Sequence, residues 1–585
     1  MNEWSLDILY KGFDDENFIN DFHALDSKIE NCIKLTNALS HEDEVTTLKN
    51  VLAALEKYTV LKEKVRSFIS LNQSTDTANS KAASLYNQLS QKCSASSKVF
   101  SKFQRYISEI KDLKSCIAQD AMLEEYSFLL TSIKDDSKYL LSDDVEEILT
   151  KMNITGGSAW ENLQSYLTST VEVEYKGDKT TLSQIRNLAY DSDCTVRKAA
   201  YDAELDSYKK IRDSIAFSLN SIKAQVLTEC ELRGFDSPLA MTLHQAHMKQ
   251  ETLDALMSAL KSYLPKFHSY LRRKAELLGH KNGLPWYDLF APMHTEAKSY
   301  TVEEAREYLL NHFRPFADDM ADMMERAFNE NWIDFFPRKG KVGGAFCANL
   351  PYVKQSRVLT NFDGSLGDIV TLAHELGHAY HGMMIENHRP LNTGYSMPVA
   401  ETASTFNENI IMDAAIDEAK ENDKIALIEN QLQDLTQTMC DIYSRFLFEK
   451  TVFEKCKDTF LFPDELENIM VEAQKKAYGD GLDSNYLHPY MWICKSHYYS
   501  SDLSFYNFPY AFGSLFAKGL VLKYHEDKEN FVPKYRELLK ATTIQNVEDV
   551  AKMVDIDLSD ENFWLHCLDA CGKRIDEFLE LTENA

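Results

Sequence analysis

Long segments of the sequence place apolar residues at helical spacing, and few residues interrupt them. From Phe18 the apolar positions 18, 22, 25, 29 and 32 step by four and three, which puts them on one helix face. Gly and Pro number only 20 and 13 among 585 residues, about half the usual share. We therefore expect a mainly α protein with two or more domains or lobes.

Four stretches depart from the helical pattern. Residues 152–163 contain Gly156-Gly157 and are expected to be irregular. Residues 170–182 alternate polar and apolar side chains around a Lys-Gly-Asp turn, which predicts a hairpin. Residues 336–370 hold five glycines and two prolines among apolar residues, so short strands and loops are predicted there. A second irregular patch, 478–489, precedes a stretch dense in aromatic residues.

Charge and cysteine usage exclude several classes of partner. The net charge of −28, from 63 basic and 91 acidic residues, repels phosphate backbones and argues against nucleic-acid binding. The 11 cysteines include no CxxC pair, which is typical of a reduced compartment. No signal-peptide pattern and no run of 18 apolar residues is present. We expect a soluble cytoplasmic protein without a membrane partner.

The sequence TLAHELGHAYHG (371–382) predicts a zinc site. His374 and His378 lie one turn apart on one helix face, so both imidazoles can bind one Zn²⁺. Glu375 is rotated aside, where it would reach a zinc-bound water and take its proton. The neighbouring residues are uncharged, unlike those of an ordinary surface helix. We expect one Zn²⁺ per chain.

The third ligand is expected to be Glu401. His381 follows on the same side of the helix, but three rungs span about 10 Å and the third overshoots a metal held by the first two; a structural histidine is the preferred interpretation. The pattern HExxHxxGxxH is excluded, because positions 381 and 384 hold His and Met. A helix predicted over 396–410 carries Glu401 as ligand and, two turns on, Glu408 as partner of a ligand histidine. A solvated helix acid is the alternative for Glu408.

HELGHAYH, followed 27 residues after His374 by Glu401 in PVAETASTFNE, resembles the oligoendopeptidase F family, relatives of thimet oligopeptidase among the zinc peptidases. The resemblance extends over nearly the whole chain, through WSLDILY (4–10), GGSAWENL (156–163), 181–203, GGAFC (343–347), 361–382 and 497–513. It implies a mainly α, two-lobed helical zincin peptidase with a deep substrate channel and a small β-sheet near the active site.

The resemblance also implies a function. The chain would be a zinc-dependent endopeptidase that hydrolyses internal bonds of short oligopeptides in cytosolic peptide turnover. Glu375 would deprotonate the attacking water and then protonate the leaving amine. We divide the chain into an N-terminal helical region (1–112), a helical and hairpin region (113–200) and a catalytic zinc peptidase domain (201–585).

The aromatic segment after residue 496 contains candidate oxyanion donors. His497, Tyr506 and Tyr510 match the family's His and Tyr cluster downstream of the zinc helix. Core packing is the alternative, because phenylalanines at 505, 508 and 512 interleave with them. Two further tyrosines, Tyr498 and Tyr499, are also possible donors.

GKVGGAFC (340–347) predicts an exposed strand edge. Gly343 and Gly344 leave room there for a substrate backbone to pair by strand addition. A tight bend without a ligand is the alternative.

Two competing functions have distinct requirements. A helical zinc carboxypeptidase or peptidyl-dipeptidase needs a group that clamps the terminal carboxylate of its substrate. A non-catalytic peptide-binding protein predicts loss of Glu375 or of a ligand, and all four residues are present.

Overall fold

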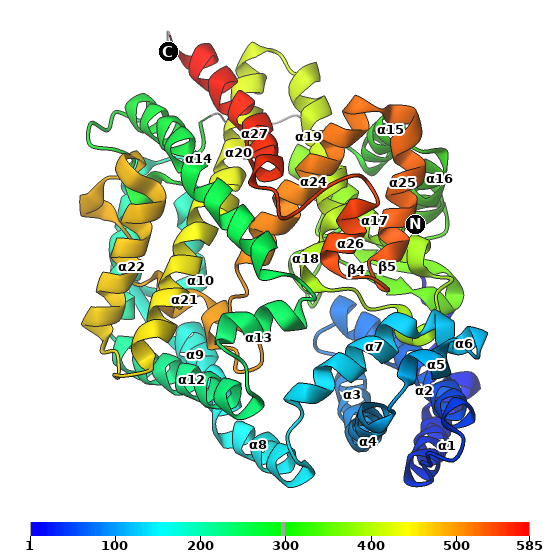
Figure 1. Cartoon of the computed structure of the whole chain (residues 1–585). Coiled ribbons are helices and arrows are strands. Elements are labelled where there is room, and N and C mark those ends of the chain that lie inside the picture. The colour runs from blue at the N-terminus through cyan, green and yellow to red at the C-terminus, as the bar shows by residue number, and fades with distance from the viewer. Residues whose placement is uncertain (1, 294–298, 584–585) are drawn as a thin grey trace. The chain divides into compact units, whose positions relative to one another are not determined.

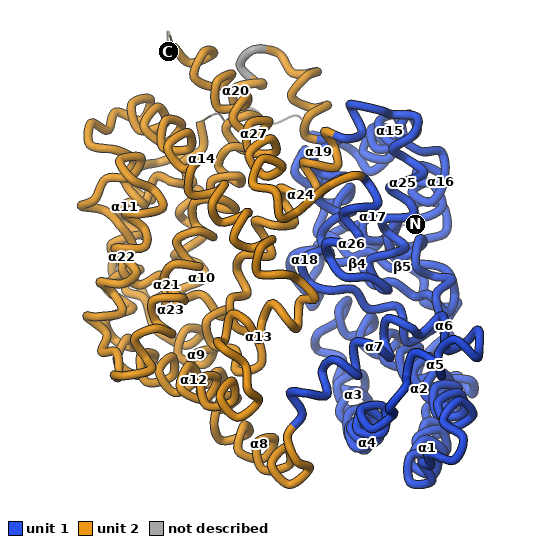
Figure 2. The backbone as a smooth tube through the Cα atoms, in the orientation of Figure 1, with its two compact units in different colours: residues 1–140, 297–411, 523–554 blue, residues 141–296, 412–522, 555–585 orange. Residues whose placement is uncertain are grey.

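The computed structural model describes residues 2–293 and 299–583, which form two compact units. Unit 1 comprises residues 1–140, 297–411 and 523–554, and unit 2 comprises 141–296, 412–522 and 555–585 (Figure 2). Helices dominate both units, so the predicted mainly α fold is confirmed (Figure 1). Each unit is assembled from three segments, and its boundaries do not coincide with 112/113 or 200/201. The three contiguous domains therefore stay a prediction.

The first 140 residues of unit 1 form a helical layer. The predicted helix from Phe18 is confirmed as α1, in which Phe18, Phe22, Leu25 and Ile29 are all buried. Asp15 caps this helix, because its Oδ1 accepts from the N–H of Asn17 at 2.9 Å. The helices are α1 (Glu16–Asn37), α2 (Glu44–Thr75), α3 (Ser80–Cys93), α4 (Ser96–Glu109), α5 (Leu113–Ile117), α6 (Ala121–Glu125) and α7 (Ser127–Asp136).

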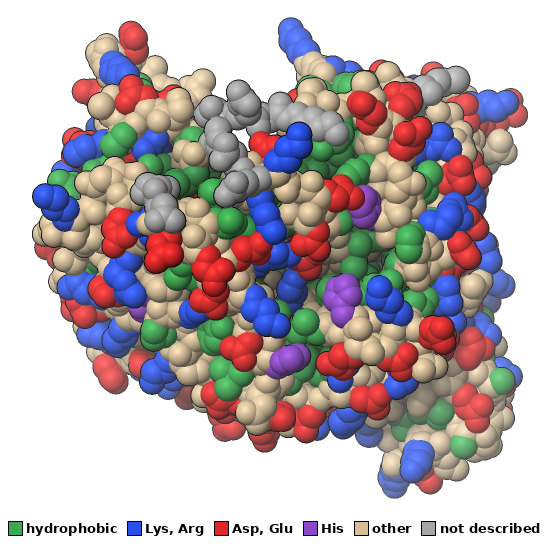
Figure 3. Space-filling view, turned by 90° about the horizontal axis from the view of Figure 1, so that it is seen from above, with side chains coloured by type: hydrophobic (Ala, Val, Ile, Leu, Met, Phe, Trp, Pro, Cys, Tyr) green, Lys and Arg blue, Asp and Glu red, His purple; other side chains and the backbone are tan. Residues whose placement is uncertain are grey.

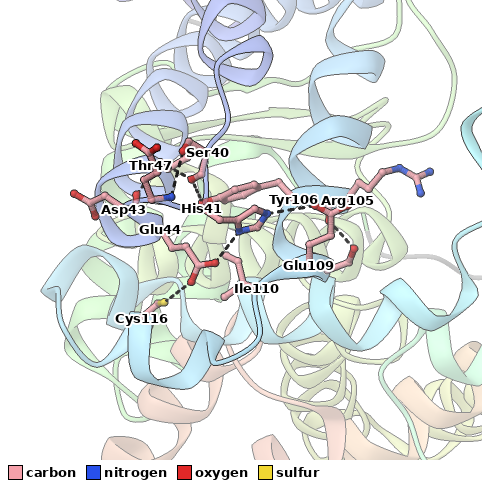
Figure 4. Close-up of polar contacts among 12 residues, drawn as sticks. Ser40, His41, Asp43, Glu44, Thr47, Arg105, Tyr106, Glu109, Ile110 and Cys116 are labelled. Carbon is pink, nitrogen blue, oxygen red and sulfur yellow. Dashed lines mark hydrogen bonds and ion pairs between the residues drawn. The ribbon is translucent and has the colours of Figure 1, made fainter.

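A histidine between two carboxylates links α2 to α4 in this layer (Figure 4). His41 Nδ1 lies 2.7 Å from Glu44 Oε1, and its Nε2 lies 3.3 Å from Glu109 Oε2. The ring stacks on Tyr106 at a centroid distance of 4.6 Å. The imidazole is about half exposed, so this is a surface contact between helix ends.

The rest of unit 1 surrounds a small mixed sheet. Its strands are β3 (Ile333–Asp334), β4 (Phe346–Leu350) and β5 (Gln355–Leu359), in the order β3-β5-β4. β3 and β5 are parallel, and β4 pairs antiparallel with β5 and forms an edge. Helix α17 (Leu366–Ile385) packs against β4 and β5. The other helices are α15 (Val302–Phe313), α16 (Asp318–Asn329), α18 (Met397–Ala400), α25 (Lys528–Ala541) and α26 (Val547–Lys552).

Unit 2 is almost entirely helical, with one two-stranded hairpin. The predicted hairpin is confirmed as β1 (Glu172–Tyr175) and β2 (Asp178–Thr181), whose turn holds Lys176 and Gly177 at positive φ. Long helices α14 (Gln250–Leu277) and α27 (Glu561–Thr582) pack against each other. The others are α8 (Asp143–Thr155), α9 (Gly157–Thr170), α10 (Leu182–Asn187), α11 (Cys194–Tyr208), α12 (Arg212–Arg233), α13 (Pro238–Gln245), α20 (Glu421–Thr436), α21 (Ile442–Cys456), α22 (Pro463–Tyr478) and α23 (Met491–Cys494). Helices α19 (Thr402–Glu418) and α24 (Phe508–Glu526) each contain a unit boundary.

The irregular stretch predicted at 152–163 is mostly helical, and only the predicted turn is present, at Gly156. Helix α8 runs to Thr155 and α9 starts at Gly157, so only Gly156 separates them. A Cβ on Gly156 would lie 2.6 Å from Oε1 of Gln225. Oε1 of Gln225 on α12 also accepts from the N–H of Gly157 at 2.7 Å, so the break between α8 and α9 lies against α12.

Acidic and basic side chains are interspersed on the face drawn in Figure 3. The net charge of −28 is thus not gathered into one acidic patch on that face. Among the described helices, none combines the length and the apolar composition needed to cross a lipid bilayer.

Candidate active site

The start of α17 is fixed by a reciprocal cap. The Ser365 side chain accepts from the N–H of Asp368, and Asp368 Oδ2 accepts from the N–H groups of residues 363, 364 and 365. Gly364 has φ +97°, and a Cβ there would lie 2.9 Å from the carbonyl oxygen of Tyr300. This tight entry sets where each residue of α17 points.

The structure brings the three predicted metal ligands together. His374 Nε2 and His378 Nε2 lie 3.2 Å apart, and Glu401 Oε2 lies 3.4 Å and 3.2 Å from them. Two imidazole nitrogens and one carboxylate oxygen fit Zn²⁺ and leave a fourth position open. Among the described residues, this is the one cluster of three His, Cys, Asp or Glu side chains close enough to hold a metal ion.

The prediction that one continuous helix carries both Glu401 and Glu408 is wrong. The short helix α18 ends at Ala400, the next residue Glu401 has a φ of −93° and a ψ of 9° that are not helical, and α19 begins at Thr402. Oγ of Ser404 donates to Glu401 Oε2 at 2.9 Å and holds the carboxylate.

Glu408 lies where its predicted role requires. Its Oε1 is 2.6 Å from Nδ1 of His374, on the ring edge opposite Glu401. Burial favours the neutral imidazole, but the hydrogen bond to Glu408 and its charge outweigh burial and raise the pKa of His374. A carboxylate in this position orients a ligand histidine and increases its basicity.

Glycine at 377 permits the contact between α17 and α19. A Cβ there would lie 2.6 Å from the carbonyl oxygen of Ala403, so the two helix backbones touch. Beside this contact, Asn407 Nδ2 donates to the carbonyl of Ala373 at 3.0 Å. The ligands on the two helices are thus held by contacts within one turn of them.

Burial sets the properties of Glu375. The residue is 5% exposed, and burial raises the pKa of its carboxyl group. The carboxylate makes no hydrogen bond to a described residue. It lies close enough to Cys347 of β4 that its charge adds to burial in raising the pKa of that thiol. A carboxylate with a raised pKa can both accept and return a proton.

His381 is separate from the ligand group. It is fully buried, its Nε2 lies 2.7 Å from Oγ1 of Thr542, and its ring stacks on Tyr395 at 4.4 Å. Burial lowers the pKa of His381 to about 3, so the ring is neutral. This placement suits a structural histidine.

The prediction that Gly343 and Gly344 belong to an exposed strand is wrong. Strand β4 begins only at Phe346. Both glycines are exposed in a bend with open space around them, and Gly344 has φ +77°. The Asn361 side chain donates to the carbonyl oxygen of Gly344 and fixes the bend outside the ladder. The strand that follows lies beside α17, where Asn349 Nδ2 donates to the carbonyl of His378 at 3.2 Å.

The candidate oxyanion donors cluster in unit 2. Tyr510 Oη lies 3.3 Å from His497 Nε2, and the Tyr506 ring is 5.2 Å from that of His497 and 5.5 Å from that of Tyr510. Tyr510 is 39% exposed, whereas the interleaved phenylalanines at 505, 508 and 512 are buried. The phenylalanines therefore occupy the core positions. The two alternative donors, Tyr498 and Tyr499, are buried as well.

Helix α21 supports this segment, which the sequence did not indicate. Asn507 Nδ2 donates to Glu449 Oε2 at 3.0 Å, and the other carboxylate oxygen lies 2.7 Å from Nζ of Lys223. Lys223 and Glu449 are both 1% exposed. Phe505, at φ +54°, stacks on Phe453 of the same helix. The position of Glu449 among the apolar residues of FLFEKTVF could have indicated a buried charge. Its partner Lys223 could not be identified, because it lies 226 residues away.

Cations also act on His497. Burial first, and then the charges of Arg445 and Lys495, lower its pKa. Arg445 on α21 is paired with Asp441, the residue directly before that helix. The imidazole is therefore kept neutral beside Tyr510.

Known proteins resemble this chain along most of its length. A family model described as peptidase family M3 matches residues 187–569, and one described as oligopeptidase F matches residues 109–172. The group B oligopeptidase PepB of Streptococcus agalactiae serotype III (strain NEM316) is 27% identical over 89% of this chain and 87% of its own length. Oligopeptidase PepF of Bacillus subtilis (strain 168) is 24% identical over 99% of this chain and 87% of its own length.

A solved structure has the same fold. The crystal structure of oligoendopeptidase-F from Enterococcus faecium superposes with a TM-score of 0.72 at 20% identity, covering 97% of this chain and 99% of that chain. The M3 model alone matches well over half of the residues. The chain therefore belongs to peptidase family M3 and is a metallopeptidase.

Proposed function

We propose that the protein is a zinc-dependent endopeptidase that cleaves internal bonds of short oligopeptides and serves cytosolic peptide turnover. The observation that carries this proposal is the meeting of His374 Nε2, His378 Nε2 and Glu401 Oε2 beside the buried carboxylate of Glu375. The names of the oligopeptidase relatives support the substrate class. The 11 cysteines, all free, support a reducing compartment.

His374, His378 and Glu401 would hold the metal ion. Zn²⁺ at this position supplies a Lewis acid that polarises the scissile carbonyl and acidifies water. Glu408 would keep the His374 ring oriented through its Nδ1 contact.

Glu375 would move the protons of the reaction. Its carboxylate accepts a proton from the attacking water and returns that proton to the leaving amine. Burial supports this role because a raised pKa brings the carboxyl group nearer to the working pH.

The residues of unit 2 would stabilise the oxyanion that forms on the substrate. Tyr510, the exposed member of the cluster, is the proposed main donor, with His497 and Tyr506 as its neighbours. The neutral His497 beside its hydroxyl supports this assignment, because it can share a hydrogen bond with Tyr510.

The free edge of β4 would align the substrate. β4 pairs on one side only, with β5, so its other edge offers backbone groups to an extended peptide. Gly343 and Gly344, in the open bend before β4, would allow the peptide backbone to pass close by.

The test is product analysis of a peptide mixture blocked at both ends. We expect internal cleavage, seen by mass spectrometry as paired fragments, and its loss when a chelator removes the metal. Restoration by added Zn²⁺ is the control for chelator damage. Cleavage only of peptides with a free terminus would favour the exopeptidase alternative, and full activity after chelation would exclude a metal-dependent reaction.

A further inference from the structure

Unit 2 contains a cavity of about 660 Å³ that the proposed reaction does not use. It is bordered by α9, α10, α11 and α23. Its lining includes Arg186, Glu204, His488 and Lys495, with aromatic side chains on the remaining wall, such as Tyr190 and Phe290.

Two cations in this cavity have unused donors. The side chain of Lys495 forms no hydrogen bond or ion pair with any residue that the structure describes. Arg186 contacts Glu204 through Nε at 3.3 Å, and its two terminal nitrogens have no hydrogen-bond partner among the described residues. Arg197, which also lines the cavity, is satisfied by Asp288 at 2.8 Å and by two carbonyl oxygens. The unused donors are therefore confined to Arg186 and Lys495.

His488 is a third polar group without a hydrogen bond. It is 1% exposed, and neither ring nitrogen has a hydrogen-bond partner among the described residues. Its Nε2 lies 3.4 Å from Glu204 Oε1, beyond a good hydrogen bond. Buried polar groups are nearly always paired, so a cavity with such a group in its wall is suited to a polar ligand.

The unused donors in the cavity favour an anion. Glu204 already accepts from Tyr208 at 2.9 Å and contacts Arg186. Asp434 is the other acid in the lining, so the charges of Arg186 and Lys495 are balanced and the preference for an anion comes from their unused donors. A guanidinium and an ammonium group on one polar wall match a carboxylate, and the aromatic wall matches apolar atoms next to it.

We propose that this cavity binds a carboxylate group of a peptide through Lys495 and Arg186. This inference rests on the proposed peptidase function, because it takes the anion from the substrate class. The chain also places Lys495 two residues before His497, and Lys495 acts on that imidazole electrostatically. The cavity wall and the candidate oxyanion donors thus share one segment of unit 2. A carboxylate held here would anchor one end of a short peptide and would favour short substrates over long chains.

Binding to the full-length protein tests the inference without any hydrolysis. The probes are acetyl-Ala-Phe with a free C-terminal carboxylate and the same dipeptide as its amide, measured by isothermal titration calorimetry. We expect the acid to bind at least about tenfold more tightly, since the carboxylate accepts charge-assisted hydrogen bonds that the amide cannot. Lys495→Met should abolish this preference, and Lys495→Arg should restore most of it.

A matched lysine provides the control. Lys476→Met removes the same charge from an exposed position on α22 of the same unit and should leave the preference unchanged. Because the Lys495 ammonium group has no hydrogen bond or ion pair to lose among the described residues, the melting temperature of Lys495→Met should not fall below that of the parent. Arg186→Met is a second variant with the same expected loss of preference.

A second pair of probes identifies the source of the carboxylate. Acetyl-Ala-Glu-amide and acetyl-Ala-Gln-amide differ only in a side-chain charge. A Lys495-dependent preference for the Glu peptide would also support the cavity and would assign it to acidic side chains. Equal binding of all four probes, or a preference that survives both Lys495→Met and Arg186→Met, overturns the inference. Cleavage of blocked peptides would be unaffected by that outcome, so the proposed function is judged separately.

Discussion

The metal-ligand group of unit 1 and the aromatic cluster of unit 2 are built in different ways. His374 and His378 are placed by the period of one helix, and Glu401 stands at the head of the next helix packed on it. His497, Tyr506 and Tyr510 lie on irregular backbone and at the start of α24. One group depends on local geometry and the other on distant supports such as Lys223 and Glu449.

This difference teaches which part of a site can be recognised without a structure. A pair of ligands on one helix has a fixed spacing, so its residues are readable as a motif. Donors held by long-range contacts have no fixed spacing. Their identity depends on which aromatic side chains the core takes up, and this follows only from the packing.

The largest effect on turnover is expected at Glu375, which lies on the same helix as the two histidine ligands but is not a ligand itself. Glu375→Gln should lower turnover by several orders of magnitude while zinc content and peptide affinity are retained, because the proton acceptor is lost and the ligands remain. Steady-state kinetics and metal analysis measure both. Glu386→Gln, at the end of the same helix, is the control. Turnover within about tenfold of the parent would remove Glu375 from its role.

Tyr510→Phe tests the aromatic cluster. Turnover should fall by roughly 10²–10³, the range for loss of one oxyanion donor, with little change in KM. Folding should be unaffected because the hydroxyl group is partly exposed and the ring stays. Tyr506→Phe should cost less. If both variants turn over normally, the two tyrosines have a structural role only, and the oxyanion donors lie elsewhere.

Metal affinity should rank the residues around His374. Glu408→Gln should weaken zinc binding by about 10–100-fold, the usual cost of losing a partner of a ligand histidine. Glu401→Gln should weaken it more, and His381→Ala should weaken it least, because His381 contacts Thr542 and not the ligand atoms. Competition with a fluorescent zinc chelator gives the three values. A larger loss for His381→Ala than for Glu401→Gln would mean that the third ligand is misassigned.

The smallest effect is expected at His41, which links α2 to α4 and does not contact a metal ligand. Its contact with Glu44 is similar in length to that between His374 and Glu408. The hydrogen bond to Glu44 raises the pKa of His41, so its stabilisation is present below the unfolded pKa and is lost as pH rises through the folded value. His41→Gln should therefore lower the melting temperature slightly at pH 5.5 and not at pH 9. For a surface pair the expected loss in free energy of unfolding is about 0.2–1 kcal/mol. Altered turnover of His41→Gln would contradict the assignment of this contact to the surface of the fold and not to the site.

Much of the fold was predictable because it is local. The helix over Phe18–Cys32, the hairpin around Lys176 and the HExxH helix all follow from periodicity and turn residues. The errors occurred where a distant group decides. Residues 152–163 were taken for an irregular stretch because the packing of α8 and α9 against α12 cannot be foreseen from sequence.

The candidate site divides along the same line. The two histidines and both glutamates were named from spacing, and the structure places His378, Glu401 and Glu408 all in contact with His374. The helix break at Glu401 and the bend at Gly344 were missed, since each is fixed by a side chain, Ser404 or Asn361, that bonds to it in three dimensions. The cavity at Lys495 has no sequence signature at all.

The metal ligands are shared between α17 and the segment that starts α19, and these two pieces touch backbone to backbone at Gly377. An ion that needs both pieces binds the docked arrangement and not the separated one. Zinc should therefore act as a thermodynamic ligand of folding, with a free energy of unfolding that rises by RT ln(1 + [Zn]/Kd) and a melting temperature that rises with it. Under metal starvation the protein would lose the stabilisation of these two helices together with its activity.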